Sequence, residues 1–365
     1  MLSDATSRGR FSVDFGEPHD DTTQEQDSML TFAIIGAGRI GHVHAANVAA
    51  HPGARLGVVV DPVPGAAERL SEAYGARSSL EMADALGDDI DAIIIGSPTP
   101  FHVDHILAGI GAGKAVLVEK PVDLDLARVD ECIAAVRGSE HRVMVAFNRR
   151  FDAGIAEVRT RVEQGEIGPA RQVTIISRDP APPPLDYVAR SGGIFRDMSI
   201  HDVDLARSIL GEFVEVQAFG QRSDPQLEEF EDFDGAVITL RTADGAIATI
   251  INSRFCAAGY DQRLEVFGPL GSLETTNHRE TSVVFNAHSG STVHPYQPFF
   301  LERYAQAYRS ELDHFVSAIE AGTAPQPGLP DGRAALVLAD AATASAARGE
   351  RVLLEPVSST TKVLS

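Results

Sequence analysis

The stretch MLTFAIIGAGRIG, residues 29–41, decides the fold of the chain. An apolar run that reads as a strand, Phe32–Ile35, leads directly into Gly36-Ala-Gly38-Arg-Ile-Gly41, and a helical pattern follows over 40–50. In such a unit the first glycine allows a tight turn, the second lets the backbone approach a pyrophosphate, and the third packs helix on strand. The helix start offers free N–H groups to phosphate. The stretch therefore predicts a dinucleotide site.

The region from 30 to 148 continues the same alternation of short apolar runs and helical patterns. Strands are predicted at 32–35, 56–60, 92–95, 115–118 and 143–147, and helices near 40–50, 64–74, 102–112 and 124–137. Continuous apolar strands separated by helices are typical of a parallel sheet that is covered on both faces. We therefore expect an α/β fold with a Rossmann dinucleotide-binding domain over 29–148.

The pattern changes after residue 150, where strand-like runs follow one another closely. A helix is predicted at about 152–164, followed by a Pro-rich loop at 179–184 and a helix at 197–210. Strands are predicted next, at 213–221, 235–241, 246–253, 262–267 and 271–275. Two helices, at about 300–320 and 331–347, close the chain. This predicts an α+β domain over 149–365 with a large, mostly antiparallel open sheet. One face of that sheet lacks helices to cover it, so we expect oligomerisation there.

Composition excludes several classes of protein. The formal net charge of −21 disfavours a nucleic-acid partner. No run approaches the roughly 18 apolar residues of a membrane helix, and the first residues lack the apolar region of a signal peptide. Cys132 and Cys256 lie far apart, which suits a reducing compartment, and form no metal-ligand cluster. We expect a soluble cytoplasmic protein without a metal. Residues 1–28 are expected to be a disordered tail, with Met29 as a hypothetical natural start.

The cofactor site gains support from two further segments. Asp61 ends the second predicted strand, where a carboxylate accepts hydrogen bonds from the adenosine ribose and repels a 2′-phosphate, which favours NAD over NADP. The alternative is that Asp61 only caps the next helix. Ser97 and Thr99 follow the third predicted strand and are expected to line the cofactor. His102 is a further candidate, with an ordinary helix residue as the alternative.

Two clusters carry candidate catalytic groups. The segment Glu119-Lys120-Pro121 directly follows a predicted strand, and a lysine at that position can stabilise charge on an alcohol oxygen. Pro121 permits a cis peptide bond that would direct the Lys120 side chain into the cleft. Asp197 and His201 are spaced i, i+4 on a predicted helix, so the carboxylate would orient the imidazole and raise its basicity. Such a histidine can remove the hydroxyl proton. The alternative is a surface pair on the helix.

The charged residues around these clusters are assigned simpler roles. Asp202 and Asp204 are interpreted as caps or solvated carboxylates. Arg149 and Arg150 follow Asn148 where the two domains meet, and each either binds substrate hydroxyls or forms a salt bridge between the domains.

Taken together, these motifs resemble the glucose–fructose oxidoreductase/inositol dehydrogenase/rhizopine-catabolism (Gfo/Idh/MocA) family over about 30–350. The resemblance implies a catalytic triad of Lys120, Asp197 and His201. It also implies that the dinucleotide is contacted by the glycine turn with Arg39 and Ile40, by the 97–102 loop, and by Glu119 and Pro121.

Segments 190–202, 259–268 and 299–312 look typical of the inositol dehydrogenase branch of that family. This implies a homotetramer for inositol catabolism that oxidises myo-inositol to 2-keto-myo-inositol with NAD. Asn148, Arg149 and Tyr260 would lie near the substrate, whereas 299–312 is equally well explained as a packing helix. The alternatives are a dehydrogenase of another cyclitol or pyranose, and a non-catalytic NAD-dependent sensor.

Overall fold

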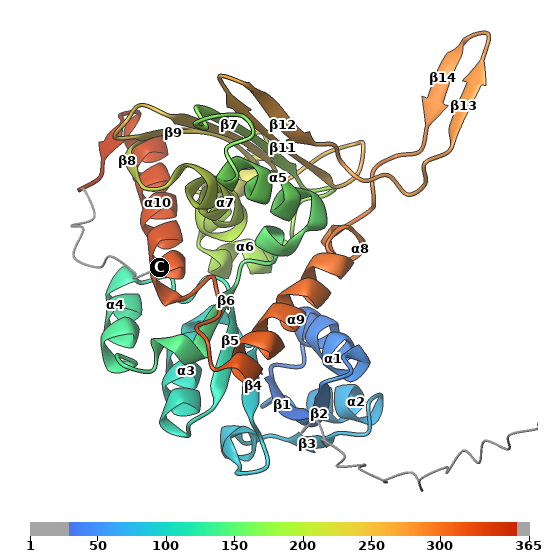
Figure 1. Cartoon of the computed structure of the whole chain (residues 1–365), viewed down its shortest axis with the longest axis vertical. Helices are drawn as coiled ribbons and strands as arrows, with labels where there is room; N and C mark the ends of the chain where they lie inside the picture. Colours follow the sequence, from blue (N-terminus) through green and yellow to red (C-terminus); the bar gives the residue numbers. More distant parts are fainter. Residues whose placement is uncertain (1–28, 356–365) are drawn as a thin grey trace, which may run out of the picture.

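The first sheet of the protein is the parallel sheet that its apolar runs predict. The computed structural model describes residues 29–355 and contains two lobes (Figure 1). The lower lobe holds a six-stranded parallel sheet in the order β3 (Arg77–Ser79), β2 (Ala54–Val60), β1 (Leu30–Ile35), β4 (Ala92–Ile95), β5 (Ala115–Glu119), β6 (Val143–Ala146). The strand order reverses between β1 and β4, and ligands bind outside the carboxyl ends of strands at such a point. The Rossmann prediction is confirmed, apart from β3, which has no apolar run.

Helices cover both faces of this sheet because alternate strand residues point to opposite sides. Phe32 and Ile34 pack towards α1 (Arg39–Ala50), α2 (Ala66–Glu72) and α9 (Ala305–Ala321). Ile93 and Ile95 belong to the core on the other side, which includes residues of α3 (His102–Gly111), α4 (Leu126–Ala135) and α10 (Leu329–Arg348). Two helices that follow the second domain in sequence therefore complete the first domain, although the sequence assigned all of 149–365 to the second.

The second sheet is mixed and has seven strands. Its order is β12 (Gly271–Thr275), β11 (Asp261–Gly268), β7 (Gln172–Arg178), β10 (Ile247–Ser253), β9 (Gly235–Thr242), β8 (Phe213–Gln221), β15 (Val352–Leu353). The predicted mostly antiparallel sheet is confirmed, with β7 and β10 as a parallel pair. Two strands were not predicted from the sequence: β7, whose inward side includes the polar Ser177, and the two-residue β15.

Only one face of the second sheet is covered by helices of the described chain. α5 (Ala153–Glu163), α7 (Ile200–Leu210) and α10 contribute to the core on that face. Side chains that point the other way are exposed, among them Phe219 at 60% and Val237 at 42%. The uncovered face that the sequence predicted is therefore present in the single chain.

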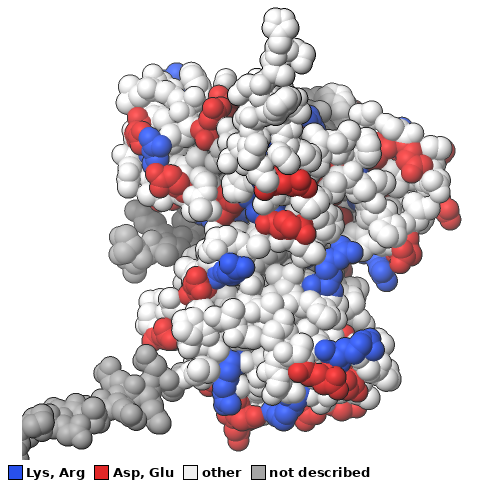
Figure 2. All heavy atoms as spheres, turned by 90° about the vertical axis from the view of Figure 1, so that its right-hand side faces the viewer, with Lys and Arg blue, Asp and Glu red and all other residues white. Residues whose placement is uncertain are grey.

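The remaining elements are short. They are α6 (Leu185–Ser191), α8 (Phe300–Arg303), the hairpin strands β13 (Val284–Ala287) and β14 (Gly290–Val293), the 3-10 turns at Met82–Leu86, Thr99–Phe101, Glu140–Arg142, Asn148–Phe151 and Pro225–Glu228, and a π-helical turn at Phe195–Ser199. The hairpin, which was not predicted, projects from the body and shows no charged side chain (Figures 1 and 2). The predicted helix at 300–320 is divided at Tyr304. The predicted tail, 1–28, lies outside the described residues.

Candidate active site

The glycine turn after β1 has the shape that a pyrophosphate requires. A Cβ at Gly36 would lie 2.6 Å from the Gly96 carbonyl oxygen, and one at Gly41 would overlap the Gly36 carbonyl oxygen. Those two glycines are therefore needed for the turn itself. Gly38 faces open space, since nothing lies within 4 Å of a Cβ built there. α1 begins directly after it without a side-chain cap, so its first N–H groups are available to phosphate.

Asp61 lies beside this turn and supports it. Its Oδ2 accepts a hydrogen bond from the Ala37 N–H at 2.8 Å, and its Oδ1 accepts one from the Val63 N–H at 2.9 Å. The following helix, α2, is capped at Gly65, so the alternative role for Asp61 as its cap does not apply. Each carboxylate oxygen has a second lone pair. Asp61 can therefore still accept hydrogen bonds from a ribose diol, and the residues present fit NAD.

The two residues that open α1 have hydrophobic neighbours. The guanidinium of Arg39 lies over the ring of Phe299, 5.5 Å from its centroid. Ile40 packs against a cluster of buried aromatic residues that includes Tyr260 and Tyr304. α1 thereby links the glycine turn to the second domain.

His102 contacts the backbone of two loops at the carboxyl ends of the parallel strands. Its Nδ1 lies 2.8 Å from the Pro121 carbonyl oxygen and its Nε2 lies 2.7 Å from the Ser97 carbonyl oxygen. Burial lowers the pKa of the ring. Because both nitrogens face the backbone, His102 ties the loop after β4 to the loop after β5 and does not present a free nitrogen to a ligand. The Ser97 hydroxyl lies 3.0 Å from His105 Nδ1, and Thr99 begins the short turn that follows.

Lys120 lies where the two domains face each other. The bond between Lys120 and Pro121 is cis. The Lys120 ammonium donates to the Asp197 carbonyl oxygen at 2.7 Å and lies 3.6 Å from the Asp197 Oδ1. The preceding residue, Glu119, has its Oε1 2.8 Å from His44 Nε2 on α1. The lysine is thus held by backbone and carboxylate of one residue, 77 positions further along the chain.

Asp197 does not pair with His201 as the spacing predicted. It lies in the π-helical turn, where the side-chain spacing differs from that of an α-helix. Its Oδ1 accepts a hydrogen bond from the Tyr187 hydroxyl at 2.7 Å, and its Oδ2 lies 3.9 Å from Arg254. Within residues 29–355, His201 Nδ1 is buried and has no hydrogen-bond partner. Asp197 is therefore a partner of Lys120.

The basicity predicted for His201 is also wrong in direction. Burial is the largest cause that lowers its pKa, and the positive charges of Lys120 and Arg149 add to it. The ring lies edge-on to Phe147, with centroids 6.1 Å apart. The imidazole is therefore neutral near pH 7 and able to accept a proton without first losing one.

Arg149 forms a salt bridge, but its partner lies in the same range, 149–365, and not in the other predicted domain. It is buried, forms an ion pair with Asp202, and donates to the Ser177 hydroxyl at 2.8 Å. Asp202 is fully buried, so its assignment as a cap or solvated carboxylate is wrong. The two other predicted substrate residues, Asn148 and Tyr260, are also buried, with 3% and 4% exposure.

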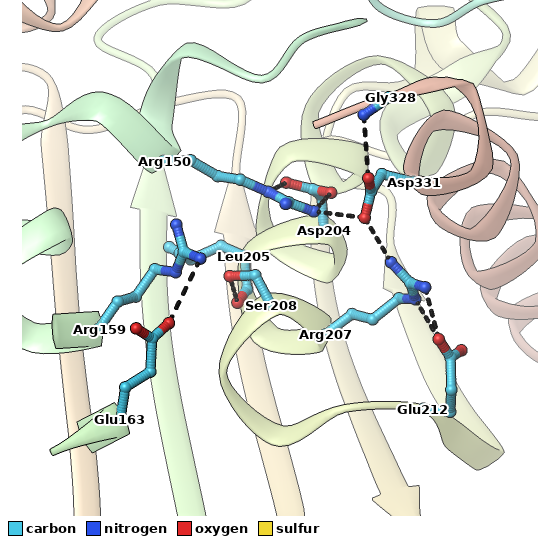
Figure 3. A network of polar contacts seen from close by, with 10 residues as sticks. All are labelled: Arg150, Arg159, Glu163, Asp204, Leu205, Arg207, Ser208, Glu212, Gly328 and Asp331. Atoms are coloured by element: carbon cyan, nitrogen blue, oxygen red, sulfur yellow. Dashed lines mark hydrogen bonds and ion pairs between the residues drawn. The ribbon is translucent and has the colours of Figure 1, made fainter. Parts of the chain in front are cut away.

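The next residue, Arg150, makes a similar pair with Asp204, which lies two positions after Asp202 on α7 (Figure 3). It donates to both carboxylate oxygens of Asp204, at 2.7 and 2.6 Å, and to Asp331 at 3.1 Å. Arg207 joins the same Asp331 oxygen at 2.8 Å. Asp204 is 1% exposed, so it too was wrongly assigned to solvent. The sequence assigned Asp202 and Asp204 to solvent because carboxylates are rarely buried alone. A carboxylate can be buried when it is paired with a cation, and the arginine partners were not foreseen.

Sequence reasoning missed three polar residues at this site, and β7 explains two of them. Arg178 of β7 pairs with Ser253 of the parallel strand β10, so Asp179 and Arg254 leave the sheet side by side. Burial raises the pKa of Asp179 to about 6, against the opposing charge of Arg149. Arg254 is buried and lies 3.0 Å from Asp232. If β7 had been predicted, Asp179 and Arg254 would have been recognised as neighbours at the carboxyl ends of two adjacent parallel strands. The third missed residue, Tyr187, lies on α6, which the sequence did not predict.

The arrangement brings a cation close enough to a neutral imidazole for the charge of Lys120 to lower the pKa of His201. Lys120 supplies the positive charge and His201 the base, and the position of each is set by a different domain. In residues 29–355, no three His, Cys, Asp or Glu side chains are grouped as metal ligands. In the same range, no helix is long and apolar enough to span a lipid bilayer.

Comparison with known proteins agrees with this geometry. A profile described as an oxidoreductase family with an NAD-binding Rossmann fold matches residues 30–147, and the profile of the GFO/IDH/MocA C-terminal domain matches residues 155–274. The chain belongs to the GFO/IDH/MocA oxidoreductase family. The resemblance inferred from the motifs is confirmed.

Three similar family members indicate where in the family the chain lies. It is 45% identical to an inositol 2-dehydrogenase of Rhizobium meliloti, covering 88% of this chain and 98% of the relative. A solved myo-inositol dehydrogenase of Corynebacterium glutamicum is 46% identical, with a TM-score of 0.87 and coverage of 90% and 99%. A scyllo-inositol 2-dehydrogenase (NAD(+)) of Bacillus subtilis is 36% identical over 90% of this chain and 97% of its own length.

Proposed function

We propose that this family member is an NAD-dependent inositol 2-dehydrogenase that oxidises myo-inositol to 2-keto-myo-inositol (scyllo-inosose). The observation that carries the proposal is that Lys120 contacts Asp197 and that its charge helps to lower the pKa of His201, in a chain whose glycine turn and Asp61 fit NAD. The similar proteins from Rhizobium meliloti and Corynebacterium glutamicum support the substrate.

The roles of the three catalytic residues follow from their contacts. Lys120 donates a hydrogen bond to the alcohol oxygen and stabilises the negative charge that develops there. His201, neutral because of burial and nearby cations, accepts the hydroxyl proton. Asp197 holds the lysine through its carbonyl oxygen and lies near it with its carboxylate. Bound NAD supplies the hydride acceptor.

The substrate ring requires hydrogen-bonding groups that converge on its other hydroxyls. We assign this role to Asn148 and Tyr260, and add Asp179, whose carboxyl lies among the charges of Lys120, Arg149 and Arg254. Arg149 is already engaged by Asp202, so we assign it an electrostatic role: its charge helps to keep His201 unprotonated. A site built to hydrogen-bond hydroxyls rejects analogues that lack them.

The decisive experiment measures NADH formation with myo-inositol, scyllo-inositol, D-chiro-inositol and glucose, each with NAD and with NADP. Turnover of myo-inositol with NAD alone supports the proposal. A preference for scyllo-inositol, the substrate named for the Bacillus subtilis relative, would retain the chemistry and change the substrate. Binding of NAD without turnover of any ring would favour a sensor instead.

We further propose a homotetramer in which the second domain supplies the contacts between copies as well as the substrate residues Asp179 and Tyr260. The uncovered face of the second sheet carries exposed apolar side chains that include Phe219 and Val237. Two chains of net charge −21 repel each other, so contacts are most favourable where charge is missing. Light scattering tests the assembly, with Phe219→Glu expected to weaken it; a monomeric unmodified protein would refute it.

We also propose that the enzyme works in the cytoplasm. Its two cysteines, Cys132 and Cys256, are both free thiols, as expected of a protein in a reducing compartment. Finding the native protein in an extracellular fraction would contradict this.

A further inference from the structure

Glu311 is a buried acid that the proposed reaction does not use. It lies on α9, its exposure is 0%, and within residues 29–355 neither carboxyl oxygen has a hydrogen-bond partner. Burial raises its pKa well above the usual range, and the charge of Glu119 acts in the same direction. An ionised carboxylate without partners is too costly in a protein interior, so the group is a neutral acid with a proton to donate.

The packing of α9 on α1 shows what Glu311 faces. The ring of His44 lies edge-on to Tyr308, with centroids 5.8 Å apart, and further along both helices His51 lies 3.4 Å from Asp313. The contacts therefore advance along both helices in the same order, and Figure 1 shows α1 next to α9. Glu311 lies between these two contacts on α9.

The facing surface of α1 offers matching unpaired atoms. Within residues 29–355, His44 Nδ1 and Asn47 Nδ2 are buried without a hydrogen-bond partner. Asn47 lies between His44 and His51, as Glu311 lies between Tyr308 and Asp313. Side chains on a helix lean towards its N-terminus, and the charge of Glu119, which contacts His44, acts on Glu311; from these two facts we infer that the Glu311 carboxyl points towards His44.

One buried water molecule would satisfy these groups together. A buried water typically forms about three hydrogen bonds to polar groups that would otherwise be unpaired. Here it would accept from the Glu311 acid and from Asn47, and donate to His44 Nδ1. With Nδ1 accepting, the proton of a neutral His44 is on Nε2, which lies 2.8 Å from Glu119 Oε1.

We propose that Glu311 is a positioning residue that, as a neutral acid acting through a buried water molecule, fixes the tautomer of His44 whose Nε2–H donates to Glu119. Glu119 immediately precedes Lys120, so this chain of contacts links α9 to the end of β5 at the catalytic lysine. The consequence for catalysis rests on the proposed function, whereas the protonation of Glu311 does not.

Two variants separate this role from simple packing. Glu311→Gln keeps a donor in the form of an amide N–H, and Glu311→Leu removes it while filling the space. We expect Glu311→Gln to retain kcat/KM for NAD close to wild type, and Glu311→Leu to lose about tenfold, because Glu119 loses a fixed partner. Glu320→Gln, an exposed change on the same helix, is the matched control. Wild-type kinetics in a folded Glu311→Leu variant would overturn the proposal, as would an equal loss in both variants.

The protonation state is measured independently of turnover. In an infrared difference spectrum between wild type and Glu311→Gln at neutral pH, we expect a carboxylic acid carbonyl band from the wild type. A carboxylate band would refute the neutral acid even if Glu311→Leu does not fold. Failure of the inositol assay would leave the infrared result and an NAD-binding titration interpretable, so the two proposals fail separately.

Discussion

The neighbouring pairs Arg149–Asp202 and Arg150–Asp204 allow a matched test of what buried charge contributes to stability. Asp202→Asn leaves the Arg149 guanidinium with the Ser177 hydroxyl and without its carboxylate. Asp204→Asn leaves Arg150 with Asp331, 3.1 Å away. Both aspartates lie on α7 and both are buried. The variants differ in what remains for the arginine and in that Asp202 also accepts a hydrogen bond from Asn252 Nδ2 at 2.8 Å.

The expected magnitudes follow from that difference. Removing one partner of a buried pair costs about 3–5 kcal/mol, which we expect for Asp202→Asn. With a second carboxylate in place, Asp204→Asn should cost about 1–3 kcal/mol, as for hydrogen bonds to a charged group. Urea unfolding at pH 7 measures both free energies, provided the slope with urea is unchanged. A larger loss for Asp204→Asn than for Asp202→Asn would refute the reasoning.

Four further predictions concern the cofactor, the base and the buried acid. Gly38→Val should fold normally yet bind NAD poorly, because its side chain fills open space, whereas Gly41→Val should lower the thermal midpoint; the reverse pattern in unfolding and binding titrations would contradict the turn geometry. Asp61→Ala should weaken NAD binding and raise the use of NADP, and an unchanged cofactor ratio in kinetics would exclude the assigned role. His201→Ala should lower kcat by about 10²–10⁴-fold. Since the pKa of His201 is lowered, the pH profile of wild-type kcat/KM should show no rise due to this group above pH 7. A rise above pH 7 that disappears in the variant would contradict the lowered pKa. Because the pKa of Glu311 is raised, its contribution to stability is present below the unfolded pKa of about 4.3 and is lost as pH rises towards the folded value. In urea unfolding over that pH range, wild type should therefore lose about 1.4 kcal/mol of unfolding free energy per pH unit relative to Glu311→Gln. Parallel curves for the two proteins would count against a neutral acid.

The first domain was predictable because its signals are local. The apolar strands, the spacing of Gly36, Gly38 and Gly41, and the position of Asp61 all lie within short windows of sequence. The same holds for Lys120 at a strand end. Each of these features depends on backbone geometry that neighbouring residues determine.

The rest of the site depends on contacts between distant residues. Asp197 meets Lys120 across 77 positions, and Asp202 meets Arg149 across 53. A local spacing rule paired Asp197 with His201 instead, because it assumed a regular α-helix where a π-helical turn occurs. The strand β7 was not predicted because Ser177 interrupts its apolar side. Without β7, nothing in the sequence placed Asp179 at the carboxyl end of a strand.

The return of α9 to the first domain gives the molecule three chain passages between its lobes. The chain leaves the parallel sheet after β6, comes back at α9, and continues into α10, which contacts both lobes. With a single linker one lobe could rotate freely relative to the other, whereas three passages of the chain restrict that rotation. The relative position of Lys120, at the end of β5, and His201, on α7, is therefore set by several passages of the chain and not by one flexible linker.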